Sequence, residues 1–133
     1  MPGTTFELEG FTAQLEKLEY VPSSTTPAHR PHQFTYSIIL RNDSLRRLRV
    51  LSRKWVLTSS QQETLVVEGE GVVGQYPDLS PGQTFHYTSF HLIKGNTMAA
   101  GMYFAEDEDG NRVAARLTPF KMVVPTSESV LPD

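Results

Sequence analysis

The chain has 133 residues, no cysteine and a formal net charge of −3. Its length is enough to bury one core without cross-links, and its acidic balance argues against affinity for nucleic acid or anionic membranes. The absence of cysteine excludes disulfides, thiolate metal sites and thiol nucleophiles, and fits the cytoplasmic location that we expect. No apolar run approaches the roughly 20 residues of a membrane-spanning helix.

Strand signals dominate the sequence. The clearest is at residues 33–41, where Phe34, Tyr36, Ile38 and Leu40 alternate with polar residues. Seven segments rich in β-branched or aromatic residues predict strands, at residues 11–21, 33–41, 48–58, 63–68, 84–91, 98–106 and 112–124. Clusters of turn-forming residues separate these segments, and none of them has helical periodicity.

This pattern predicts an all-β fold, an immunoglobulin or fibronectin type III-like β-sandwich of about seven antiparallel strands. A small barrel is the competing architecture. Trp55, the only tryptophan, lies in the third predicted strand and is expected to anchor the core. We assign residues 1–125 to a single domain and residues 126–133, with their Ser, Pro and acidic residues, to a flexible C-terminal tail.

The most distinctive motif contains three glycines, Gly69, Gly71 and Gly74, in the spacing of a dinucleotide-binding loop. Pro77 and a Pro-Gly pair follow, so no helix can begin there, and a Rossmann site is disfavoured. The loop amides could instead bind an anion together with Arg53, although two neighbouring glutamates oppose one. We favour a structural role, in which the glycines permit positive φ angles at the edge of the fold.

Two runs of charged residues offer weaker candidates for binding. Residues 46–54 hold five cations, and strand alternation places Arg47, Arg49 and Arg53 on one side and Arg46 and Lys54 on the other. This split predicts a solvated surface and no single anion-binding patch. The acidic run at residues 106–111 does not fit the ligand positions of a calcium loop and predicts a β-hairpin turn.

Metal and catalytic sites find little support. His29 and His32 have no nearby carboxylate or cysteine to complete a shell, and His86 and His91 are five residues apart, which predicts opposite faces of a strand. We therefore expect no metal and no cofactor. Because recognisable catalytic motifs are missing, we expect that the protein is not an enzyme.

Five segments together closely resemble the ApaG family: residues 51–55 (LSRKW), 69–77 (GEGVVGQYP), 79–82 (LSPG), 85–89 (FHYTS) and 119–125 (PFKMVVP). They occur in order over about residues 11–125, which is far more specific than the glycines alone. The resemblance implies a fibronectin type III-like β-sandwich, found alone in small bacterial proteins and as a module in some eukaryotic F-box and polymerase-interacting proteins. Within the family the glycine motif has been considered as a pyrophosphate site, and bacterial members are loosely associated with cobalt resistance and magnesium efflux. Lys54 stands where the family often has histidine, which argues against a metal role at that position.

Our leading functional prediction is a non-enzymatic binding domain that mediates protein–protein interaction, and a homodimer through an exposed edge strand is a further expectation. The alternative is a small-molecule or ion-responsive protein linked to cobalt or magnesium homeostasis. It would bind a phosphorylated ligand at Gly69, Gly71, Gly74 and Arg53.

Overall fold

The computed structural model describes residues 4–22 and 26–126. Within them the chain forms nine strands and no helix: β1 (Phe6–Glu7), β2 (Phe11–Val21), β3 (His32–Asn42), β4 (Leu48–Ser59), β5 (Thr64–Glu70), β6 (Asp78–Leu79), β7 (Thr84–Ile93), β8 (Thr97–Asp107) and β9 (Arg112–Met122). The all-β prediction is confirmed, whereas the count of seven is wrong. The two strands that were missed, β1 and β6, have two residues each and are too short to show alternation.

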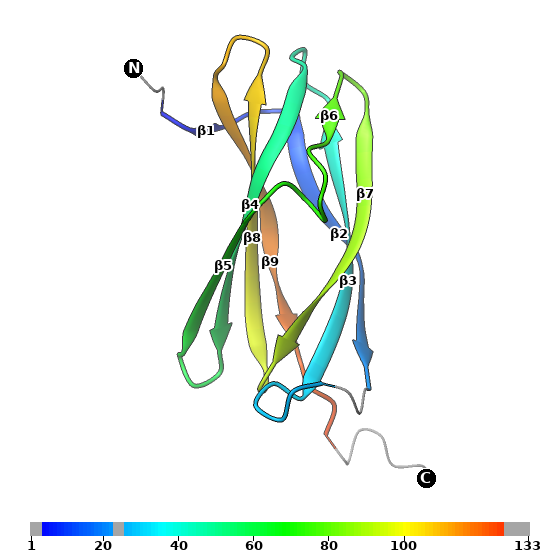
Figure 1. Ribbon diagram of the computed structural model, residues 1–133, viewed down its shortest axis with the longest axis vertical. Helices are drawn as coiled ribbons and strands as arrows, with labels where there is room; N and C mark the ends of the chain where they lie inside the picture. Colours follow the sequence, from blue (N-terminus) through cyan, green and yellow to red (C-terminus); the bar gives the residue numbers. More distant parts are fainter. Residues whose placement is uncertain (1–3, 23–25, 127–133) are drawn as a thin grey trace.

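The strands form a mixed sheet in the order β5-β4-β8-β9-β2-β3-β7, curled into a half-barrel (Figure 1). β1 adds to β9 in parallel, and β6 adds to β4 in antiparallel orientation. β9 and β2 meet through a single parallel pair, Ala13 with Leu117, so the expectation of antiparallel strands throughout is also wrong. This sparse link divides the sheet into one part with β5, β4, β8 and β9 and another with β2, β3 and β7.

Aromatic side chains fill the space between these two parts. Trp55 of β4 is 1% exposed and lies 5.0 Å from the ring of Tyr36 on β3 and 4.6 Å from that of His91 on β7. Tyr87 of β7 likewise packs against Tyr103 of β8. Since these contacts join strands that are not neighbours in the sheet, the two parts face one another, and the role expected for Trp55 as a core anchor is confirmed.

A bulge in β4 controls which of its side chains enter the core. The pairing with β8 shifts between Val50 and Ser52, so one residue of β4 has no counterpart. Val50 points inward before the shift and Trp55 after it. Arg53 therefore shares a face with Trp55, and Arg49 points to the other face. The prediction that these two arginines lie on one side is wrong because an extra residue reverses the alternation.

The structure describes most of the predicted domain and almost none of the predicted tail. Residues 127–133, nearly all of the predicted tail, lie outside the described residues, and the assignment of residues 1–125 to a single domain stays a prediction. No helix able to cross a membrane is found in the part of the chain that the structure describes.

Candidate functional site

The second half of the glycine motif forms a two-residue hairpin. Val72 and Gln75 exchange two backbone hydrogen bonds, of 2.7 and 3.0 Å, around Val73 and Gly74. Val73 and Gly74 have φ angles of 44° and 80°. Positive φ at both central positions is the signature of a type I′ turn. Two successive left-handed residues do not make the alternating right- and left-handed pair of an anion-binding nest.

The first half of the motif is held by β4. The N–H of Gly71 donates to the carbonyl of Leu51 at 2.6 Å, and the φ of Gly71 is 65°. A Cβ at Gly71 would overlap the Gln75 carbonyl oxygen, and a Cβ at Gly69 would approach the guanidinium of Arg53 within 2.6 Å. The glycines thus permit a close approach and left-handed backbone, as the structural interpretation requires.

Arg53 lies beside the glycine motif, as an anion site would require, but its guanidinium is already bound to backbone carbonyls of the motif. Its Nη1 donates to the carbonyl oxygens of Glu70 at 3.2 Å and Gly71 at 3.0 Å. A depression of about 410 Å³ beside it is lined by Ser52, Lys54 and Phe104 as well as by both glutamates of the motif. Gly69, Gly71 and Arg53 therefore meet in space, whereas Gly74 lies in the adjoining turn. The Gly71 amide and the Arg53 guanidinium are bound to backbone carbonyls, and the two glutamates are close by.

Three buried tyrosines lie on the core side of Arg53. The hydroxyls of Tyr87 and Tyr103 share a hydrogen bond. Burial raises the pKa of Tyr36, Tyr87 and Tyr103, and the positive charge of Arg53 only partly opposes this. The cluster consequently remains protonated near neutral pH and cannot supply a phenolate base or nucleophile there.

The five cations of residues 46–54 contact five different groups. Their partners are Asp107 for Arg46, Asp78 for Arg47, the ring of Tyr76 for Arg49, the loop carbonyls for Arg53 and Glu68 for Lys54. The paired hydrogen bonds from Arg47 lower the pKa of Asp78. Each cation thus has its own partner. This agrees with the expectation that they form no single anion-binding patch, although the faces predicted for Arg49 and Arg53 are wrong.

The acidic run is a hairpin turn between β8 and β9, as predicted. Gly110 has a φ of 83°, and the Asp107 N–H donates to the carbonyl of Asn111 at 3.0 Å. Hydrogen bonds from Asn111, from the Asp109 amide and from Arg46 lower the pKa of Asp107. Over the described ranges, no group of three or more His, Asp and Glu side chains is arranged to hold a metal ion.

His86 and His91 do point to opposite faces of β7. His86 is exposed and pairs with Glu16 at 3.0 Å, whereas His91 is 8% exposed between Tyr36 and Trp55. Burial lowers the pKa of His91 to about 4. Within the described residues, His91 Nε2 and Trp55 Nε1 make no hydrogen bond. His91 is thus a neutral core residue.

Among the residues that the structure describes, strand β5 is an edge of the sheet, paired on one side with β4. Two backbone hydrogen bonds just beyond its ends show which of its residues are bonded to β4. The Ser59 N–H donates to the Glu63 carbonyl at 2.8 Å, and the Gly71 N–H donates to the Leu51 carbonyl at 2.6 Å. Along an antiparallel ladder, residues that are hydrogen-bonded to the neighbouring strand alternate with residues whose backbone groups point away from it. The backbone groups that point away from β4 are therefore those of Thr64, Val66, Glu68 and Glu70.

The side chains of β5 make this edge apolar as well as open. Leu65, Val66 and Val67 are 38%, 49% and 36% exposed. Protein edges are usually protected by charged side chains, Pro or a bulge. β5 has neither Pro nor a bulge over residues 64–70, and its two charged residues, Glu68 and Glu70, lie at its C-terminal end. An edge with both unpaired backbone groups and exposed aliphatic side chains is a template for a further strand.

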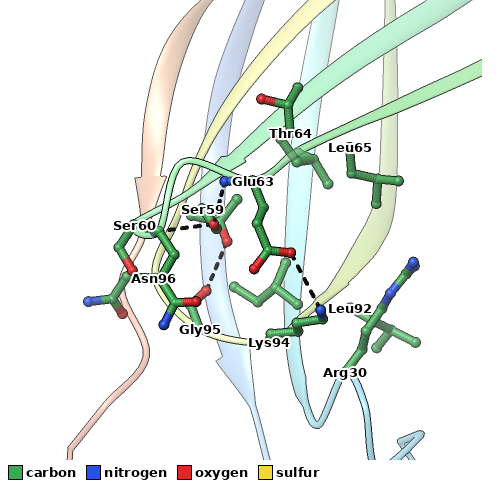
Figure 2. Close-up of a pocket in the computed structure, with 14 residues that line it drawn as sticks. Arg30, Ser59, Ser60, Glu63, Thr64, Leu65, Leu92, Lys94, Gly95 and Asn96 are labelled. Atoms are coloured by element: carbon green, nitrogen blue, oxygen red, sulfur yellow. Dashed lines mark hydrogen bonds and ion pairs between the residues drawn. The ribbon is translucent and has the colours of Figure 1, made fainter.

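A pocket of about 390 Å³ lies at the lower end of β5 (Figure 2). Its apolar lining comes from Leu57, Leu65, Leu92 and Ile93, and its polar rim from Arg30 and the turns at residues 59–64 and 94–97. The Lys94 ammonium and the Glu63 carboxylate, 3.6 Å apart, join the two turns. No sequence motif marked this pocket, because it forms where three separate segments converge.

The family model and the curated relatives agree on one family. A model of the ApaG domain matches residues 22–106. The chain is 37% identical over 111 residues to Protein ApaG of Ralstonia nicotianae, covering 82% of this chain and 89% of that protein. It is 33% identical over 107 residues to Protein ApaG of Photobacterium profundum, covering 80% and 84%. The crystal structure of the putative ApaA protein from Bordetella pertussis superimposes with a TM-score of 0.75 at 28% identity, covering 90% of this chain and 99% of that one.

Proposed function

The chain belongs to the ApaG domain family, and we propose that it is a non-enzymatic, cytoplasmic binding domain that takes up an extended segment of another protein along β5. The observation that carries this proposal is the open edge of β5. It combines outward backbone groups at alternate residues with three exposed aliphatic side chains. Strand addition to such an edge supplies affinity through main-chain hydrogen bonds and specificity through side chains.

The rest of the molecule supports a rigid scaffold for that edge. We propose that the two facing parts of the sheet are the layers of an immunoglobulin or fibronectin type III-like sandwich, with the aromatic seam between them. Because β4 is buried against β8 on one side, it fixes the position of β5 on the other.

The alternative function, a phosphorylated ligand at the glycine motif linked to cobalt or magnesium homeostasis, receives less support. Arg53 and the Gly71 N–H already bind backbone carbonyls, so an anion would have to displace both. It would also lie near Glu68 and Glu70, whose charges repel it.

A direct test is selection of binders from displayed random peptides, followed by mapping with backbone amide chemical shifts. We expect perturbed amides to centre on residues 64–70. Val66→Pro should weaken the selected peptides about tenfold or more, because it removes an N–H that points toward the partner.

Val66→Thr is the matched control, since it changes the side chain and keeps the N–H. Peptides that perturb the glycine motif or β7 instead, or that bind Val66→Pro as well as the unmodified protein, would contradict the proposal.

A further inference from the structure

We infer that the pocket at the lower end of β5 selects the partner segment by its side chains: an apolar residue enters the pocket, and a carboxylate two residues away, on the same face of the segment, pairs with Arg30. This inference rests on the proposed function, because it specifies the chemistry of the segment that adds to β5. The pocket and the edge adjoin one another, since Thr64 and Leu65 belong to both.

The apolar requirement follows from the face on which Leu65 lies. Leu65 pairs with Leu57 of β4, and both side chains line the pocket together with Leu92 and Ile93 of β7. Directly opposite residues in neighbouring strands point to the same face. A residue of the added strand opposite Leu65 would therefore direct its side chain to the pocket side. The volume of about 390 Å³ leaves ample room for a branched aliphatic or aromatic side chain.

The acidic requirement follows from the charges at the rim. Lys94 and Glu63 satisfy one another across the turns, with their charged atoms 3.6 Å apart. Arg30 is half-buried at the side of the pocket, apart from that pair in Figure 2. Among the residues that the structure describes, its guanidinium has neither an ion pair nor a hydrogen bond. A planar guanidinium is well suited to bind a carboxylate through two parallel hydrogen bonds.

A second copy of this chain is the main competing occupant of β5. Antiparallel pairing of two β5 strands would bring together protomers that each carry a net charge of −3. It would also add the Glu68 and Glu70 carboxylates of one copy to those of the other on a short ladder. Charge therefore favours a partner that brings a single acidic group to the Arg30 end of the edge.

The test uses three synthetic peptides with one extended Thr- and Val-rich framework, titrated into the isotope-labelled full chain. The first carries leucine as the anchor and a glutamate two residues away, on the same face of the strand; the second replaces the leucine by serine; the third replaces the glutamate by glutamine. We expect the first peptide to bind most tightly, with losses of about tenfold for serine and about threefold for glutamine.

Two protein variants connect each loss to its residue. Arg30→Gln should remove the difference between the glutamate and glutamine peptides and keep the difference between leucine and serine. Leu92→Ser should remove the difference between the leucine and serine peptides and keep the difference between the glutamate and glutamine peptides. Arg112→Gln, an exposed arginine that pairs with Glu106 at the β8–β9 hairpin, is the matched control and should change neither difference.

Each other outcome has a definite meaning. Equal affinities for all three peptides, each weakened by Val66→Pro, would support strand addition and overturn the pocket inference. Affinities that do not respond to Val66→Pro would overturn the proposed function and the inference that rests on it, as would the absence of any shift at millimolar peptide. A dimer in sedimentation velocity that Val66→Pro abolishes would make a second copy the occupant and overturn the inference.

Discussion

Strand β4 has two neighbours in the sheet, and they differ in almost every physical respect. Against β8, Trp55 lies over Gly101, and Tyr103 is fully buried between the two parts of the sheet. Against β5, the aliphatic side chains remain more than a third exposed. The core side holds the most deeply buried side chains of the strand, while the edge side leaves aliphatic side chains exposed. Substitutions on the β8 side of β4 should therefore change stability, and substitutions on the β5 side should change the proposed binding.

The largest effect on stability should come from the core side. Trp55→Ala removes a fully buried ring that contacts Tyr36, His91 and Phe120, and we expect unfolding to become easier by about 3–5 kcal/mol. Urea denaturation followed by tyrosine fluorescence and circular dichroism measures this change. Val66→Ala, a truncation on the β5 side, is the control and should cost well under about 1 kcal/mol. Similar losses for the two variants would remove the contrast between the two neighbours of β4.

A second effect on the core side depends on pH. Burial lowers the pKa of His91 from 6.5 to about 4, so the unfolded chain binds the proton more tightly than the folded one. The folded state should therefore be most stable above about pH 6.5 and should lose about 3 kcal/mol as the pH falls to about 4. Urea titrations at a series of pH values would show this slope.

His91→Phe is the control for this pH dependence, because it keeps an aromatic ring and removes the titrating group. Hydrogen bonds lower the pKa of Asp78 and Asp107, so their contributions to stability extend below the ordinary carboxyl range. A slope between pH 4 and 6.5 that persists in His91→Phe would show that other groups cause it.

The glycine motif should give an intermediate effect, and its glycines should differ from one another. Gly71→Ala combines a positive φ with overlap of the Gln75 carbonyl, and we expect a loss of about 2–3 kcal/mol. Gly74→Ala has a positive φ and open space around the new methyl, so about 1 kcal/mol is expected. Denaturant midpoints compare the two variants directly. Equal losses would mean that backbone conformation alone determines the cost at both positions.

Much of the fold could be predicted from the sequence because long strands carry a strong period of two. The segment 11–21 matches β2 at both ends, and six other segments match strands within a few residues. The face of Arg53 was mispredicted for a physical reason: the bulge before Ser52 adds one residue, and sequence alternation has no signal for it.

The candidate site was less predictable because its parts are distant in the sequence. The glycine motif has a strong local pattern, and its structural role followed from Pro77 and the flanking glutamates. The pocket combines Arg30, Leu65 and Leu92, which come together only when β5 and β7 take their places at the two ends of the sheet order. Which strand is an edge is likewise decided by the long-range pairing of β4 with β8.

The smallest effect on stability tests the edge side of the comparison most directly. The N–H of Val66 points away from β4, so Val66→Pro removes no hydrogen bond of the ladder and should change the free energy of unfolding by less than about 1 kcal/mol. Val67 pairs with Trp55 as a hydrogen-bonded residue, so Val67→Pro, the matched control, should cost about 3 kcal/mol or more. Urea denaturation of the two variants measures the difference. Equal costs would mean that the outward groups of β5 are not those of Thr64, Val66, Glu68 and Glu70. A partner strand would then meet the alternate set of residues.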